Sequence, residues 1–269
     1  MKKYALLDTD FISKTYSVQN GSDNHLIDRV IELPEYEFFC HVQIVTELNR
    51  YNTDTSRWLR EKIGTQKIKS YTDQAILESL SLVRGPLACV TYTQMLKLAC
   101  DAFSKDYFSE HYRALGDVDY AVISKEAYLK ELQLLDIEVG NKNNLGEIKS
   151  FVLLQVLSVM LGEQIYVFCS DDRNARNGAA SFEDVRCISL VSAFSRLKEE
   201  ANWTIDDAEP YIESLIAFYQ EHHQTTFRVM EASEVRRLKR IPCRQVLQEI
   251  FDGKFIELKN GMLQYKQYV

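Results

Sequence analysis

The chain has 269 residues, which is long enough to bury a full hydrophobic core, and its 46% hydrophobic and 26% charged residues are typical of a folded globular protein. Its formal net charge of −7 argues against a nucleic-acid binder with a generally basic surface, although it is compatible with an enzyme that has one local basic region. No segment resembles a signal peptide, and the apolar run from 151 to 161 is too short to cross a bilayer. We therefore expect no contact with a membrane.

The cysteines are scattered along the chain and predict free thiols. None is paired as Cys-x-x-Cys, and no pair of histidines stands near them in a zinc-finger spacing. Free thiols are usual in a reducing compartment, so we expect a cytoplasmic location. The six residues are Cys40, Cys89, Cys100, Cys169, Cys187 and Cys243.

The first part of the chain alternates between strand-like and helix-like patterns. A short apolar run ends at Asp8, where we expect a buried strand to turn into a helix. An aromatic-rich stretch after Pro34 predicts the next strand, and the helix that follows it carries Glu47. The predicted order is strand 4–7, a helix beginning at residue 10, an amphipathic stretch 24–33, strand 36–42 and helix 43–51.

Helical periodicity dominates residues 53–144, which we interpret as a helical insertion. A polar loop closes this segment, and a long apolar helix then precedes a strand rich in β-branched and aromatic residues. This strand ends in two aspartates. The predicted elements are helices 75–83, 92–103 and 118–135, loop 141–144, helix 145–162, strand 165–169, strand 184–188 and helix 191–200.

The alternation of strands and helices predicts an α/β domain over residues 1–200, in which a mostly parallel sheet has helices on both faces. After Ala201 the pattern changes to that of a small C-terminal α+β appendage over residues 201–269. Its predicted elements are helix 204–223, a helical stretch 233–251 interrupted at Pro242, and a β-hairpin with strands 255–258 and 262–265 around the turn signal Asn260-Gly261.

Four acids stand at strand ends or in the helices that adjoin them. A single acid in such a position is most simply a helix cap. Four together are harder to explain in this way, because clustered carboxylates repel unless a cation neutralises them, and an all-oxygen set suits Mg²⁺ or Mn²⁺. Such an ion can activate water and stabilise the charge that develops when a phosphodiester is cleaved. The four acids are Asp8, Glu47, Glu147 and Asp172.

The sequence around these acids resembles the PIN-domain family of nucleases. The closest similarity is to the branch in which a Gly-Glu helix start precedes a strand and an Asp-Asp-Arg-x-Ala-Arg turn. The resemblance covers residues 4–13, 45–50 and 145–194, and the last stretch is the most specific. It implies a PIN-like parallel sheet flanked by helices, and cleavage of RNA, which we expect to be single-stranded, with Mg²⁺ or Mn²⁺.

The resemblance assigns catalysis and metal binding to the same four acids. Asp171 stands beside Asp172 and could exchange roles with it as a metal ligand. Glu147 is longer than the aspartate usual in the wider family, although the branch resembled here also uses glutamate. Three neighbours are candidates for orienting the carboxylates, and these are Thr9, Asp10 and Ser170.

Asp117 and Asp119 offer a rival for the third acid of the set. We reject them because no strand follows their helix at the right distance, whereas Glu147 is followed by one helix and then the strand 165–169. The interval between Glu47 and the loop at 141–144 exceeds that of a compact PIN domain, which agrees with a helical insertion.

An acidic enzyme needs local cations to hold RNA. Two arginines follow the Asp-Asp pair, and a basic run lies in the appendage, where a solvated helix face is an equally good explanation. The expected partner is RNA, and the sequence leaves a homodimer or a regulatory protein partner open. The candidate RNA-binding residues are Arg173, Arg176, Arg236, Arg237, Lys239 and Arg240.

Two other interpretations remain open. Asp8-Thr9-Asp10 after a strand also resembles the haloacid-dehalogenase phosphotransferases, in which Asp8 would be the phosphate-accepting nucleophile and Asp10 a general acid and base. That family usually has Thr or Val where Ile12 stands, and it would leave Glu47 and Glu147 without a role. The second alternative is a binding protein that kept the PIN fold and lost catalysis.

Overall fold

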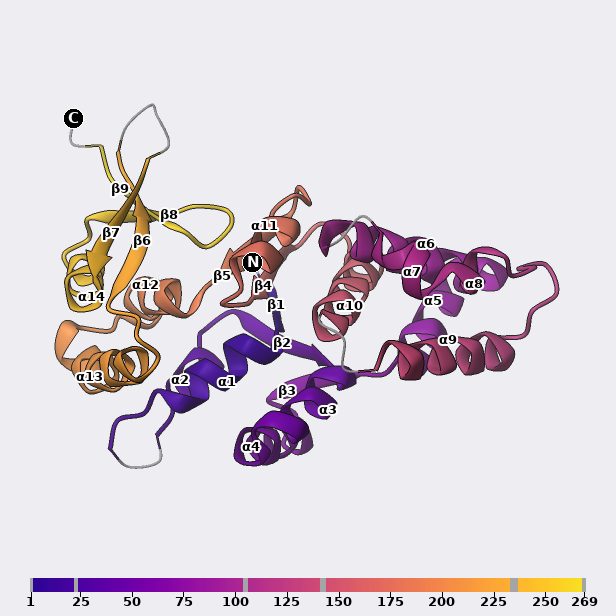
Figure 1. The fold of residues 1–269 in the computed structure, drawn as a ribbon, viewed down its shortest axis with the longest axis horizontal. Helices are drawn as coiled ribbons and strands as arrows, with labels where there is room; N and C mark the ends of the chain where they lie inside the picture. The colour runs from indigo at the N-terminus through magenta and orange to yellow at the C-terminus, as the bar shows by residue number, and fades with distance from the viewer. Residues whose placement is uncertain (1, 22–23, 104–105, 141–143, 233–236, 268–269) are drawn as a thin grey trace.

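The computed structural model describes residues 2–21, 24–103, 106–140, 144–232 and 237–267. Within these ranges the centre of the molecule is a five-stranded sheet in the order β3-β2-β1-β4-β5, and every neighbouring pair is parallel. Helices cover this sheet, so the predicted α/β class is confirmed (Figure 1). The strands are β1 (Lys3–Leu7), β2 (Tyr36–His41), β3 (Ile68–Tyr71), β4 (Ile165–Cys169) and β5 (Val185–Ile188).

The central strands are buried on both faces of the sheet. Successive side chains of a strand point to opposite faces, and in β1 Ala5 and Leu7 enter one hydrophobic core while Leu6 enters the other. In β4, Val167 and Phe168 divide between the two cores in the same way. Burial on both faces explains why these strands are almost continuous apolar runs rather than alternating patterns.

The first core joins one face of the sheet to helices from both ends of the chain. It contains Phe11 and Ile12 of the N-terminal part together with Leu215 and Val246 of the C-terminal part. Residues after 201 therefore pack their apolar side chains into the core of the α/β body. The helices on this side are α1 (Thr9–Ser17), α2 (Leu26–Val30), α3 (Val42–Tyr51), α4 (Thr53–Gly64), α12 (Leu190–Ala201), α13 (Ile205–Glu221) and α14 (Cys243–Phe251).

The second core lies on the other face and extends into a helical arm. Figure 1 shows α5 to α9 reaching away from the sheet, with α10 between the arm and the sheet. Most of the apolar residues of α10 are buried here. The helices are α5 (Asp73–Arg84), α6 (Ala88–Phe103), α7 (Tyr107–His111), α8 (Arg113–Gly116), α9 (Lys125–Val139), α10 (Leu145–Leu161) and α11 (Arg173–Ala179).

Two predictions about residues 53–144 need correction. The segment is not helical throughout, because Ile68–Tyr71 forms β3 at the edge of the central sheet. Only Ile68 of this strand is buried, so four residues gave too short a pattern to identify it. The helix predicted over 118–135 begins instead at Lys125, where the side chain of Ser124 accepts a hydrogen bond from Ala127 N at 3.2 Å.

The C-terminal region contains a second, four-stranded sheet in the order β7-β6-β9-β8. The predicted hairpin is confirmed, and residues 259–261 form its loop, since Leu258 N donates to Met262 O and Gly261 takes a positive φ of 73°. The helix predicted from 233 is wrong before Pro242, where β7 pairs with β6, while residues 233–236 lie outside the described residues. The strands are β6 (Thr226–Met230), β7 (Leu238–Pro242), β8 (Phe255–Glu257) and β9 (Leu263–Tyr265).

The described residues include no helix that is both long and apolar enough to span a membrane. All six cysteines are buried and carry free thiols, as the sequence predicts. Burial raises the pKa of Cys40 to about 12, so this thiol is protonated at neutral pH. The cysteines therefore serve as small apolar core residues.

A buried ion network fastens the helical arm to the sheet. Lys149 on α10 is 1% exposed, and its Nζ lies 3.1 Å from Asp73 Oδ2 on α5 and 2.8 Å from Asp136 Oδ2 on α9. His41 at the end of β2 places Nε2 3.3 Å from Asp73 Oδ1, and Tyr112 donates to Asp136 Oδ1 at 2.6 Å. Burial would lower the pKa of Lys149, but Asp73 and Asp136 offset this and raise it. The lysine is therefore a buried cation shared by two helices of the arm.

Replacing Lys149 by Met should lower the free energy of unfolding by about 3–5 kcal/mol, because two carboxylates would remain buried without their shared cation. Urea denaturation measures this quantity. Lys130→Met, on an exposed position of α9, is the matched control and should change stability by no more than ~0.5 kcal/mol. Equal losses in the two variants would contradict a stabilising role for the network.

Candidate functional site

Asp8 stands at the point where β1 ends and α1 begins. Its backbone N donates to Cys169 O of β4, and its side chain is fully buried. Oδ1 accepts a hydrogen bond from Thr9 N and Oδ2 accepts one from Ser170 Oγ, each at 2.8 Å. Burial raises the pKa of Asp8 well above its ordinary value, and the nearby carboxylate of Glu147 raises it further. The strand end thus holds a carboxyl group in a fixed orientation and at a high electrostatic cost.

Glu47 lies on α3 and connects two other helices through its carboxylate. Oε2 accepts a hydrogen bond from Thr9 Oγ1 at 2.6 Å, and Oε1 accepts one from Gly146 N at 2.9 Å. A Cβ atom at position 146 would lie 2.9 Å from Glu47 Cδ and Oε1 and closer still to Oε2. Glycine at 146 therefore leaves room for the Glu47 carboxylate beside the first turn of α10, and a side chain there would force the end of Glu47 to move.

Glu147 belongs to the first turn of α10 and faces the other acids. Burial is the largest influence on its carboxyl group and raises its pKa to about 7, and Glu47, Asp172 and Asp10 raise it as well. Asp8 is in turn affected by Glu147, Asp10 and Glu47. Acids from the ends of β1 and β4 and from α3 and α10 are therefore close enough to oppose one another's ionisation.

Asp171 and Asp172 have different environments although they are adjacent. Asp172 caps α11, since its Oδ1 accepts hydrogen bonds from Asn174 N at 2.5 Å and Ala175 N at 3.0 Å. Asp171 instead accepts from Lys14 Nζ at 2.8 Å and makes longer contacts of 3.3 Å with Leu190 N and the hydroxyl of Tyr219. Of the pair, Asp172 is the one that raises the pKa of Glu147.

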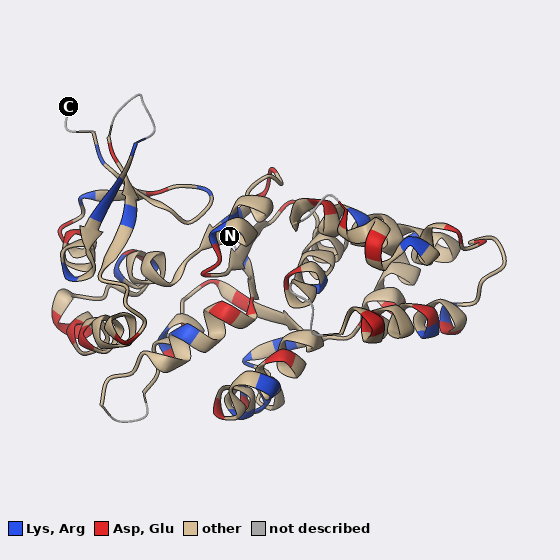
Figure 2. Ribbon diagram, in the orientation of Figure 1, with Lys and Arg blue, Asp and Glu red and all other residues tan. Residues whose placement is uncertain are grey.

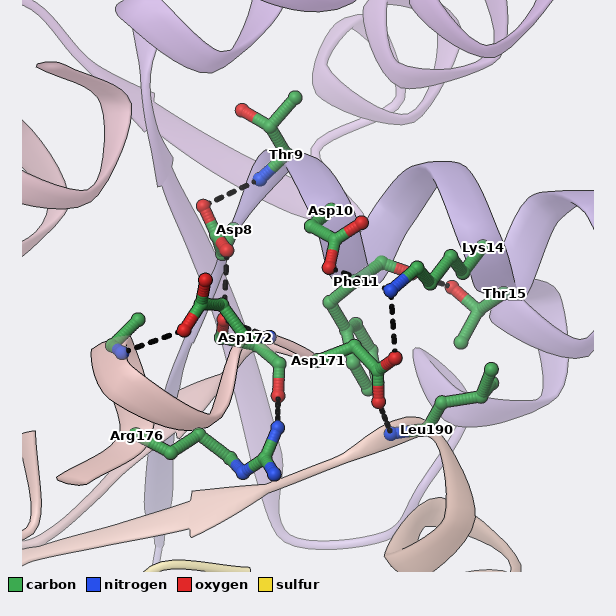
Figure 3. Close-up of polar contacts among 12 residues, drawn as sticks. Asp8, Thr9, Asp10, Phe11, Lys14, Thr15, Asp171, Asp172, Arg176 and Leu190 are labelled. Atoms are coloured by element: carbon green, nitrogen blue, oxygen red, sulfur yellow. Dashed lines mark hydrogen bonds and ion pairs between the residues drawn. The ribbon is translucent and has the colours of Figure 1, made fainter. Parts of the chain in front are cut away.

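Lys14 bridges Asp10 and Asp171. Its Nζ lies 2.9 Å from Asp10 Oδ2 and 2.8 Å from Asp171 Oδ2. Figure 3 shows the lysine side chain extending between these two acids, with Asp8 and Asp172 on the other side of Asp10. Lys14 neutralises the outer part of the acidic group, and no cation among the described residues pairs with Asp8, Glu147 or Asp172.

The acidic group offers oxygen atoms as donors. Its side chains offer carboxylate and hydroxyl oxygens, as Mg²⁺ and Mn²⁺ prefer. Among the described residues, however, no three His, Cys, Asp or Glu side chains are arranged so that they could hold one ion as they stand. The acids are neighbours, and holding an ion would require their side chains to turn toward a common point.

The rival acids Asp117 and Asp119 lie elsewhere. They belong to the connection between α8 and α9, in the helical arm, and Asp119 Oδ1 accepts a hydrogen bond from Ala121 N at 3.0 Å. The residues that most strongly shift the pKa of Asp8 and of Glu147 include neither Asp117 nor Asp119. The structure thus places the two aspartates apart from the acidic site.

The predicted RNA-binding residues differ in how accessible they are. Arg173 is exposed at the start of α11, whereas Arg176 is only 7% exposed and donates to Ser170 O at 2.8 Å and Asn260 O at 3.0 Å. Arg176 therefore braces the loop that carries Asp171 and Asp172. Arg236 is outside the described residues. The other predicted residues of the appendage, Arg237, Lys239 and Arg240, are exposed.

Three residues at this site were missed by the sequence analysis. Lys14 could have been found, because it stands four residues after Asp10 on the same helix face. Gly146 was noted only as part of a motif, and its contact with Glu47 joins residues far apart in the chain. Tyr219 reaches Asp171 from α13, and no local pattern indicates that contact.

Comparisons with family models, curated proteins and solved structures gave no match to this chain. The geometry and chemistry of the acidic site therefore provide the basis for a functional proposal.

Replacing Gly146 by Ala should destabilise the protein by about 1–2 kcal/mol, because the new methyl group displaces the Glu47 carboxylate from its two hydrogen bonds. The matched control is Gly64→Ala at the end of α4, where an added Cβ has no neighbour within 4 Å. This variant should be neutral or more stable by up to ~1 kcal/mol. Effects of the same sign and size in urea denaturation would contradict the close approach at 146.

Glu147 predicts a distinct dependence of stability on pH. Its pKa rises from the ordinary 4.5 to about 7 on folding, so between these values the folded state keeps a proton that the unfolded state releases. The metal-free protein should therefore lose stability as pH increases through this window. Glu147→Gln removes this loss. Between pH 4.5 and pH 8, the free energy of unfolding of wild type should fall by on the order of 1–3 kcal/mol more than that of the variant.

The measurement is urea denaturation in EDTA at several pH values. Glu163→Gln, at an exposed position just beyond α10, is the control and should leave the pH profile of wild type unchanged. Parallel profiles for wild type and Glu147→Gln would mean that the folded protein does not hold the carboxyl group in its neutral form.

Proposed function

We propose that this chain is a PIN-like nuclease that cleaves single-stranded RNA with the help of Mg²⁺ or Mn²⁺. The observation that carries the proposal is the gathering of Asp8, Glu47, Glu147 and Asp172 at the carboxyl end of a parallel sheet, where sites of open α/β proteins usually lie. The same four acids carry the resemblance to PIN domains in the sequence. The geometry and the sequence resemblance therefore indicate the same place, the carboxyl end of the sheet.

A cation would relieve the main electrostatic cost of this site. The pKa of Asp8 and that of Glu147 are raised because burial and neighbouring carboxylates disfavour their charged forms. Asp8, Glu147 and Asp172 are the residues that would hold the ion. When bound, it would polarise a phosphodiester and its attacking water and would offset the charge that develops during cleavage.

The residues around these acids fix and orient them. Ser170 donates to Asp8, and Thr9 donates to Glu47, so each hydroxyl leaves part of a carboxylate available for other contacts. Glu47 itself holds the first turn of α10 through Gly146 N. Lys14 keeps Asp10 and Asp171 paired, which limits the total negative charge that an approaching phosphate meets.

Replacing Asp8 by Asn should reduce Mn²⁺-dependent cleavage of single-stranded RNA at least ~100-fold, since even the residues that support metal ligands commonly contribute 10–100-fold. The fold should remain intact, and stability without metal should rise or stay the same because one repelling carboxylate is gone. Asp117→Asn, in the arm, is the control and should cleave as wild type does.

Two outcomes would overturn the proposal. Hydrolysis of a small phosphomonoester through an acyl-phosphate on Asp8, with no action on RNA, would favour the phosphotransferase interpretation. Binding of RNA by wild type with no cleavage under any divalent ion would favour a PIN-fold binding protein.

A further inference from the structure

A cleft of about 660 Å³ lies beside the acidic site and extends to the C-terminal sheet. Lys14, Asp171 and Arg173 line it on the side of the α/β body, and His222, Arg228 and Arg240 line it on the other. We call this the C-terminal cleft. Figure 2 shows basic residues on β6 and β7, the strands that supply the two distal arginines.

Arg228 and Arg240 occupy directly opposite positions on the antiparallel strands β6 and β7. Both are exposed and both line the C-terminal cleft. Like charges in opposed positions of a sheet destabilise it, unless an anion lies between them. Among the described carboxylates, none forms an ion pair with either side chain. Repulsion between the two guanidinium groups therefore destabilises the folded protein, and a bound anion would remove this repulsion.

Two other arginines near the cleft, Arg244 and Arg176, already have partners. Arg244 pairs with Glu209 and Glu213 on α13, and Arg176 donates to backbone carbonyls. Arg228 and Arg240 have no ion-pair partner among the described residues, and they are the opposed cations that also line the cleft. Arg173, exposed next to Asp172, lines the same cleft nearer the acids.

The cleft and the acidic site meet at Lys14 and Asp171. Asp171 lines the cleft and accepts from Lys14, whose Nζ also contacts Asp10 of the acidic group. Tyr219 on α13 donates to the same carboxylate, so the C-terminal region is tied to the site at this point. A chain of phosphates that contacts Arg228 and Arg240 would therefore continue past Arg173 toward Asp172.

We propose that the C-terminal cleft binds the phosphate backbone of a single RNA strand and leads it to the acidic site, an inference that rests on the proposed nuclease function. Arginine guanidinium groups bind phosphates through paired hydrogen bonds. His222 is exposed at the cleft and its ring lies tilted by 35° against Phe218, with ring centroids 4.5 Å apart, so it offers an aromatic surface to an unpaired base. A duplex keeps its bases stacked and offers none to such a surface.

The test is the binding of a fluorescent oligouridylate of about twelve nucleotides, within the length that single-strand sites commonly cover. Fluorescence anisotropy is recorded with the full chain in EDTA over a range of salt concentrations. Arg228→Gln/Arg240→Gln should weaken binding roughly tenfold or more at 0.1 M salt and reduce the slope of log K against log[salt] by about 1.4, as the loss of two phosphate contacts predicts.

The control is Arg57→Gln/Arg60→Gln on the exposed face of α4, which should leave affinity and slope as in wild type. Arg228→Lys/Arg240→Lys retains the charges and should recover most of the slope. Unchanged binding in the Gln variant, or the same loss in the control, would overturn the proposal. Equal binding of a duplex of the same length would overturn the assignment to a single strand.

Cleavage assays of the same proteins separate this proposal from the proposed function. If wild type binds RNA through the two arginines but does not cleave it, the cleft is supported and the nuclease function is wrong. If wild type cleaves RNA and the Gln variant binds as tightly with the same salt slope, the cleft is wrong and the nuclease function stands.

Discussion

Repulsion among carboxyl groups at one edge of the sheet is the constraint on which much of this structure depends. Asp8 is fully buried, and Glu147 is held nearby with a pKa raised to about 7. Ionising these buried carboxyl groups together costs the folded state free energy, which their hydrogen bonds only partly offset. The surrounding contacts are those needed to keep the acids in place, and Glu47 has the central part among them because it connects α1, α3 and α10.

The C-terminal region contacts the loop that carries two residues of the acidic site. The turn of its hairpin lies against β5, where Cys187 N donates to Lys259 O at 2.8 Å, and Gly261 approaches Cys187 O too closely for a side chain. Asn260 O accepts from Arg176, which in turn holds the loop before Asp171 and Asp172. The hairpin thus covers the edge of the central sheet and positions the loop that carries two of the acids.

The sequence was sufficient for the parts of the fold that local patterns determine. The strands 4–7 and 165–169 are apolar runs buried on both faces, and they lie within a residue of their predicted bounds. The edge strands β3 and β7 were missed because each buries a single residue, Ile68 in β3 and Ile241 in β7, which leaves no alternating apolar pattern to recognise. At the site, motif spacing selected acids that the sheet brings to one edge. The contacts Glu47–Gly146 and Tyr219–Asp171 join residues that are distant in the chain, so sequence periodicity could not reveal them.

The central claim is that these acids form a site for a divalent cation. Anomalous diffraction from crystals of the full chain soaked in Mn²⁺ tests it most directly. We predict an anomalous peak among Asp8, Glu147 and Asp172, with their side chains turned toward it, and no such peak in Asp8→Asn crystals. A peak that appears only elsewhere, or acids that keep their positions without a bound ion at millimolar Mn²⁺, would contradict it.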